Sequence, residues 1–68
     1  MLKIKEEIMK ELEKLGFKEN IYPKNYYILG ADIAVEPDRK VVVLSKQGKV
    51  ILKYLEAFDM VEKVEEDD

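Results

Sequence analysis

Apolar residues recur every three or four positions along the first fifteen residues of the chain. With this period they fall on one side of a helix, while lysines and glutamates occupy the other side. Gly16 follows directly, and glycine readily adopts the left-handed conformation that ends many helices. The pattern therefore predicts an N-terminal amphipathic helix over residues 2–15. Its apolar stripe consists of Ile4, Ile8, Leu12 and Leu15.

Residues 26–36 alternate between apolar and other positions, as in a β-strand with one buried face. Asp32 and Glu36 lie on the opposite face. A Pro-Asp turn signal at residues 37–38 follows, after which residues 40–45 resume as a strand rich in β-branched residues. The two segments are therefore predicted to pair as a hairpin. The apolar face of the first strand comprises Tyr27, Leu29, Ala31, Ile33 and Val35.

The segment after Ser45 has two interpretations. A two-residue turn at Gln47-Gly48 would make it a third strand, with its apolar residues opposite those of residues 41–45. Alternatively, Ser45 caps a helix in which Ile51, Leu55 and Phe58 share one side. Gly48 would stand in the first turn of that helix, where glycine is a poor helix former. We therefore favour the hairpin.

Residues 55–64 complete the expected order with a C-terminal helix, and a short strand over residues 60–64 is the alternative. The expected fold class is α+β, with the N-terminal amphipathic helix packed on a small antiparallel three-stranded meander and the C-terminal helix after it. The order is α-β-β-β-α, with α-β-β-α-β as the alternative. We expect a single domain over residues 1–64, followed by an acidic tail over residues 65–68.

The composition indicates a soluble globular protein, because 47% of the residues are hydrophobic and 40% are charged. No apolar run is long enough to cross a membrane, and the absence of cysteine favours a reducing, cytoplasmic location. Histidine is also absent, which excludes the usual general base and the zinc sites built from histidine and cysteine. We therefore expect a protein without enzymatic activity and without a cofactor. Its bias towards lysine and glutamate is typical of thermophile proteins.

Charge divides the second half of the chain into two parts. Between residues 39 and 53 every charged residue is positive, whereas residues 54–68 carry seven acidic residues and one lysine. The basic part could contact phosphates, with neighbouring tyrosines stacking on unpaired bases. The candidate binding residues are therefore Arg39, Lys40, Lys46, Lys49, Lys53, Tyr22, Tyr26 and Tyr27.

Net charge ranks the classes of partner. The formal charge at pH 7 is -3, whereas dedicated nucleic-acid binders are usually basic. We therefore expect a small interaction module, an accessory or regulatory factor that binds a protein partner, with nucleic-acid binding by residues 39–53 as the alternative. A homodimer through the N-terminal helix is a further expectation, because Met1, Leu2 and Met9 widen its apolar surface. No membrane partner is expected.

One stretch also resembles a known family. Asp32 lies in the stretch 30–36, Lys46 ends the stretch 40–46, and a Leu-Gly-Phe turn ends the predicted preceding helix. This arrangement resembles the core of the PD-(D/E)XK nucleases, in which an Asp and a Glu-x-Lys hold Mg²⁺ and orient the attacking water. Leu44 stands where the metal-binding Glu is expected, and Glu36 would have to replace it. The resemblance implies an inactive or degenerate nuclease-like domain, with Asp32 and Glu36 as its remote candidate metal ligands.

Overall fold

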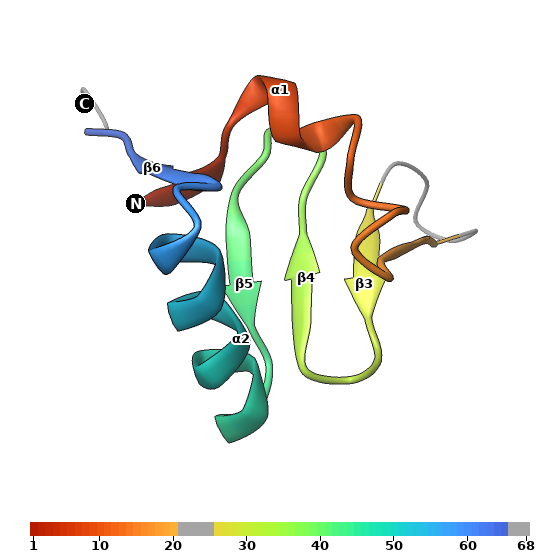
Figure 1. The fold of residues 1–68 in the computed structure, drawn as a ribbon. Coiled ribbons are helices and arrows are strands. Elements are labelled where there is room, and N and C mark those ends of the chain that lie inside the picture. The colour runs from red at the N-terminus through yellow and green to blue at the C-terminus, as the bar shows by residue number, and fades with distance from the viewer. Residues whose placement is uncertain (21–25, 66–68) are drawn as a thin grey trace.

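A computed structural model describes residues 1–20 and 26–65 (Figure 1). Within those ranges the chain is a small α+β domain with six strands in two antiparallel sheets and one helix of several turns. The elements in chain order are β1 (Leu2–Ile4), α1 (Glu6–Met9), β2 (Lys18–Glu19), β3 (Tyr27–Leu29), β4 (Ile33–Val35), β5 (Val41–Val43), α2 (Lys46–Ala57) and β6 (Val61–Lys63). The α+β class is as expected, but the predicted order of elements is wrong.

The larger sheet is an antiparallel meander in the order β2-β3-β4-β5. The single strand predicted over residues 26–36 is two strands, β3 and β4, because the chain turns back at Gly30, whose φ is +58°. The apolar face survives this break: Tyr27 lies opposite Val35, and Leu29 lies opposite Ile33. Residues directly opposite each other share a face of the sheet. The alternation therefore identified the correct inner face despite missing the turn.

The turn predicted at residues 37–38 is confirmed, since β4 and β5 pair antiparallel on either side of it. The Glu36 N–H donates to the Lys40 carbonyl at 2.9 Å, and Arg39 takes a positive φ of 76°. Three-residue hairpin loops usually need such a left-handed residue. The Arg39 carbonyl, in turn, accepts a hydrogen bond from the Ile4 N–H at 2.8 Å. This loop therefore connects the larger sheet to β1.

The N-terminal helix expected over residues 2–15 is absent. The first residues instead form β1, which pairs antiparallel with β6 so that Ile4 lies opposite Val61. Only four residues form α1, and residues 10–16 continue as turns. A short isolated helix is marginal in water, and pairing with β6 gives β1 backbone partners and a fully buried Ile4. The dimer seam expected along that helix therefore has no counterpart in the described residues.

The second hairpin is also wrong, because residues 46–57 form α2. The alternative, a helix capped by Ser45, is confirmed. The Ser45 hydroxyl accepts a hydrogen bond from the Gly48 N–H at 3.2 Å and donates one to the Asp32 carboxylate at 2.7 Å. Gly48 is buried, and a Cβ at this position would overlap the Asp32 carbonyl oxygen. Glycine therefore serves close packing of α2 on the start of β4, and not a turn.

The predicted C-terminal helix ends early, and a strand replaces its second half. After α2 the backbone reverses at Asp59, whose φ is +59°, and β6 begins at Val61. The short strand weighed for residues 60–64 is thus confirmed. The Val64 N–H then donates to the Met1 carbonyl at 2.9 Å. The smaller sheet therefore brings the two ends of the described chain together.

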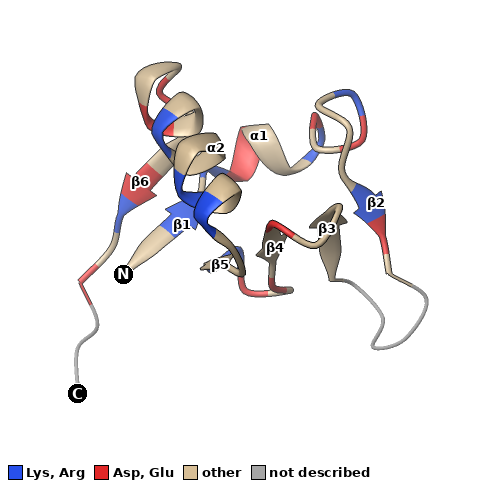
Figure 2. Ribbon diagram, turned by 90° about the horizontal axis from the view of Figure 1, so that it is seen from below, with Lys and Arg blue, Asp and Glu red and all other residues tan. Residues whose placement is uncertain are grey.

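The core lies between the larger sheet and the segments that cover one of its faces. Figures 1 and 2 show α2 beside β5, and the segment between α1 and β2 beside β3, on the same side of this sheet. Side chains from every layer meet there, and the fully buried ones are Ile4, Leu12, Ile33 and Val35. No helix in the described ranges is long and apolar enough to cross a membrane.

Candidate functional site

The helix α2 has more apolar residues than its buried side can hold. Leu55 is buried and Ile51 is half-buried against the core. Val50, Tyr54 and Phe58 follow at every fourth position, which places them along one side of the helix. Their exposed fractions are 44%, 63% and 68%. We call these three residues the apolar stripe of α2.

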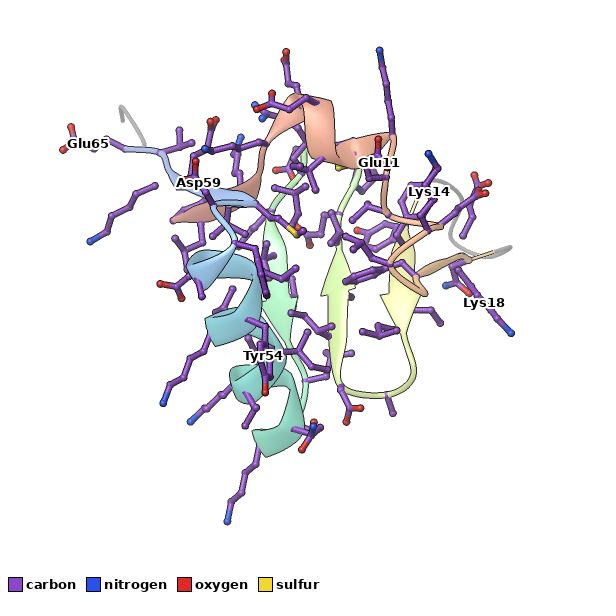
Figure 3. All side chains as sticks on the ribbon, viewed as in Figure 1. Glu11, Lys14, Lys18, Tyr54, Asp59 and Glu65 are labelled. Atoms are coloured by element: carbon purple, nitrogen blue, oxygen red, sulfur yellow. The ribbon has the colours of Figure 1, made fainter. Side chains whose placement is uncertain are left out.

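An apolar groove of about 310 Å³ runs between α2 and the segment that precedes β2. One wall is formed by Leu15, Phe17 and Leu29. The other wall is formed by Ile51, Tyr54, Leu55, Phe58 and Met60. Figure 3 shows Tyr54 on α2, with Lys14 and Lys18 on the opposite side of the same view. Among the described residues, no charged side chain lines the groove, so it is suited to receive apolar groups.

A smaller hollow extends the groove along α2. It is lined by Val50, Lys53, Tyr54 and Ala57, and it shares Tyr54 with the groove. Single exposed apolar residues are ordinary on protein surfaces, whereas contiguous ones mark interaction sites. Leu15, with 37% of its surface exposed, adds to the patch from the opposite wall. The groove, the hollow and the apolar stripe therefore form one continuous candidate binding surface.

Lysines border this surface. Lys46, Lys49 and Lys53 are all exposed and lie three and four positions apart on α2, so they form a row on one side of the helix (Figure 2). Glu56 is the one acidic residue of α2, so the helix carries three positive charges and one negative charge. None of the three lysines forms an ion pair with another described residue. We call them the lysine row.

The other predicted binding residues lie elsewhere. Arg39 and Lys40 precede β5, whereas the lysine row follows it on α2, so these cations do not align in a hairpin. The Arg39 guanidinium donates to the Ile4 carbonyl at 3.0 Å and faces Glu62 at 3.5 Å. Tyr26 and Tyr27 are half-buried at β3, where Tyr27 packs against the core. Tyr22 lies outside the described residues.

Asp32, the first residue of the nuclease resemblance, belongs to the cap of α2. The Asp32 carboxylate accepts the Ser45 hydroxyl, and the Asp32 carbonyl accepts the Leu44 N–H at 2.8 Å. Glu36 lies beyond the other end of β4, which is about 13 Å of extended chain away. In residues 1–20 and 26–65 no group of three or more carboxylates could hold a metal ion. The structure therefore does not bring Asp32 and Glu36 together.

Asp59 holds the C-terminal end of α2 beside the groove. Its carboxylate lies 2.9 Å from the Lys5 ammonium, just before β6 begins. The hydrogen bond to Asp59 raises the pKa of Lys5 above its ordinary value of 10.5, and partial burial opposes that rise. This ion pair attaches α2 to the segment after β1. The pair lies next to Phe58, which immediately precedes Asp59 in the chain.

Sequence reasoning found the lysines but missed the groove. The spacing of Val50, Tyr54 and Phe58 was a usable signal, because it adds a second stripe to the one formed by Ile51 and Leu55. The opposite wall offered no such signal, because Leu15 was assigned to the buried side of a helix. No family model, characterised protein or solved structure matches the chain.

Proposed function

We propose that the chain is a non-enzymatic protein-interaction module, an accessory or regulatory factor that binds a segment of another protein in the apolar groove. The observation that carries this proposal is the exposure of the apolar stripe beside a groove with no charged lining. Burying a large apolar side chain is worth about 1.5–3 kcal/mol. Exposed Tyr54 and Phe58 therefore represent binding energy that folding leaves unused.

An amphipathic helix is the form of partner segment that fits this surface best. Helices bind in apolar grooves through side chains at positions i, i+3 or i+4, and i+7. The groove and the adjoining hollow follow α2 over the positions from Val50 to Phe58, which is about two helical turns. Leu15 and Phe17 form the wall against which such a helix would rest.

The absence of enzymatic activity is part of the proposal. The chain contains no histidine or cysteine, and Asp32 is engaged in capping α2. Incubation with nucleic acids and Mg²⁺ or Mn²⁺ tests this part directly. We expect no turnover. Metal-dependent cleavage that disappears in Asp32→Ala would overturn it in favour of the nuclease resemblance.

Affinity capture with two matched variants tests the binding surface. Phe58→Asp places a charge in the groove, and Leu44→Asp makes the same change at an apolar residue that is 54% exposed and lines neither hollow. We expect a protein that wild type and Leu44→Asp retain from a source lysate, and that Phe58→Asp does not. Isothermal titration with the identified protein should reproduce this order. Equal retention by all three baits would exclude the groove.

Nucleic-acid binding is the second candidate, and the lysine row is the observation that favours it. Three of the five basic residues that were predicted to contact phosphates form the lysine row on one side of α2. It ranks second because Arg39 is engaged with Ile4 and Glu62, and because the net charge is -3. If the chain binds nucleic acid with an affinity that falls steeply as the salt concentration rises, nucleic-acid binding becomes the first candidate.

A further inference from the structure

The lysine row lies directly beside the apolar stripe. Lys46 and Lys53 are four and three positions from Val50, so both are its neighbours on the helix surface. Lys53 also lines the smaller hollow together with Val50, Tyr54 and Ala57. A helix that covers the stripe would therefore bring one of its own flanks against these ammonium groups.

The positions of Lys46 and Lys49 in the first turn do not favour α2 itself. Lys46 opens the helix, and its first turn contains no acidic residue. Cations at a helix N-terminus oppose the helix dipole, and like charges three or four positions apart repel each other. No described acidic side chain pairs with the row. Anionic groups of a binding partner that contact the lysine row would offset this unfavourable placement.

We infer that the partner of the groove is an amphipathic helix with acidic side chains along one flank of its apolar face, which pair with Lys46, Lys49 and Lys53. This inference rests on the proposed function. Charge complementarity selects the partner, because a flank of opposite sign is attracted and a flank of like sign is repelled. The same row disfavours a second copy of the chain. In an antiparallel two-fold pair of α2 helices, each row would face the other.

A displayed library of helical peptides tests the inference. The peptides are about four turns long, share one apolar face, and carry Glu, Lys or Gln at the positions flanking it. With wild-type bait, we expect enrichment of peptides with Glu on one flank. With Lys46→Glu/Lys53→Glu bait, the preference should change to Lys. Glutamate is favourable at the helix N-terminus, where Lys46 lies, and Lys53 is exposed, so this variant should fold.

A second pair of substitutions controls for overall charge. Lys10→Glu/Lys63→Glu changes the net charge by the same amount at exposed lysines outside α2. This bait should select the same acidic flank as wild type. For an enriched peptide, titration should show roughly tenfold weaker binding to Lys46→Glu/Lys53→Glu than to this control, which is the loss expected from a few exposed ion pairs.

The outcomes separate the inference from the proposed function. Enrichment that requires Phe58 but shows no charge preference would overturn the inference and leave the groove as a protein-binding site. Equal enrichment by wild type and Phe58→Asp would overturn both. A third arm uses single-stranded and duplex DNA. One combination of results would assign the lysine row to a nucleic-acid site. In it, DNA binds wild type but not Lys46→Glu/Lys53→Glu, and the library shows no enrichment of peptides with an acidic flank.

Discussion

At the residue scale, Gly48 has the most demanding environment in α2. Its N–H donates to the Ser45 hydroxyl, and its Cα faces the Asp32 carbonyl with no space for a Cβ. Asp32 contributes to the same contact, because its carbonyl accepts the Leu44 N–H and its carboxylate accepts the Ser45 hydroxyl. These interactions set where α2 begins and how closely it approaches β4. They also determine the direction in which the apolar stripe and lysine row extend.

Gly48→Ala should destabilise the protein, although alanine is the better helix former. In a solvent-exposed helix this substitution gains about 1 kcal/mol, but here the added Cβ must displace the backbone of Asp32. We expect a net loss of about 2 kcal/mol, typical of overpacking at a buried site. Urea unfolding measures the difference, and Gln47→Ala, at an exposed neighbour, should be nearly neutral. A more stable Gly48→Ala would contradict the contact.

At the scale of elements, α2 is held at both ends by contacts distant in sequence. The cap of Ser45 and Asp32 holds its first turn, and the pair of Asp59 with Lys5 holds its last. Backbone bonds reinforce the second attachment, since the Met60 N–H donates to the Leu55 carbonyl and the Met60 carbonyl accepts the Lys5 N–H. The groove wall formed by α2 is therefore fixed to both sheets.

Asp59→Asn should lower the pKa of Lys5 and remove a small, pH-dependent part of the stability. The folded-state pKa of Lys5 lies above 10.5, so its contribution is complete below that pH and is lost as the pH rises through the folded-state pKa. Asparagine tolerates the left-handed backbone at this position, which isolates the effect of charge. NMR titration of the Lys5 side chain measures the pKa. Glu13→Gln should leave it unchanged, and an unchanged pKa in Asp59→Asn would refute the pairing.

At the scale of the whole molecule, one loop joins the two sheets. Arg39 and Ile4 exchange two hydrogen bonds, one from the Ile4 N–H to the Arg39 carbonyl and one from the guanidinium to the Ile4 carbonyl. The same guanidinium reaches Glu62 of β6, and Lys3 forms an isolated bridge with Lys40. Arg39 was a candidate binding residue, yet its side chain is only 25% exposed and contacts two residues of the smaller sheet, Ile4 and Glu62.

Substitutions of Arg39 should separate its contacts from its backbone conformation. Arg39→Ala and Arg39→Gly both lose the bonds of the guanidinium, but glycine relieves the strain of a φ of 76°. We expect Arg39→Gly to be more stable than Arg39→Ala by about 1 kcal/mol, and both to be less stable than wild type. Thermal and urea unfolding measure this order. Equal stability of all three proteins would show that the guanidinium does not join the sheets.

The sequence by itself determined those features that depend on neighbouring residues. The turn at Pro37 and Asp38, the strand at residues 41–43 and the inner face that contains Ile33 and Val35 were all predictable from local conformational preference and alternation. The lysine row was visible as an excess of positive charge. Each of these signals occupies only a few consecutive residues, and none of them requires a partner elsewhere in the chain.

Tertiary structure decided the segments whose local pattern fits more than one element. Ile4 fits the period of a helix, but it belongs to β1, which pairs with β6 at the opposite end of the described chain. Residues 46–57 suit a strand or a helix, and contact between Gly48 and Asp32 accompanies the helix. The groove exists only once Leu15 and Phe58 are brought to the same face of the molecule. Such contacts between distant residues leave no periodic trace in the sequence, because their energy depends on the whole fold.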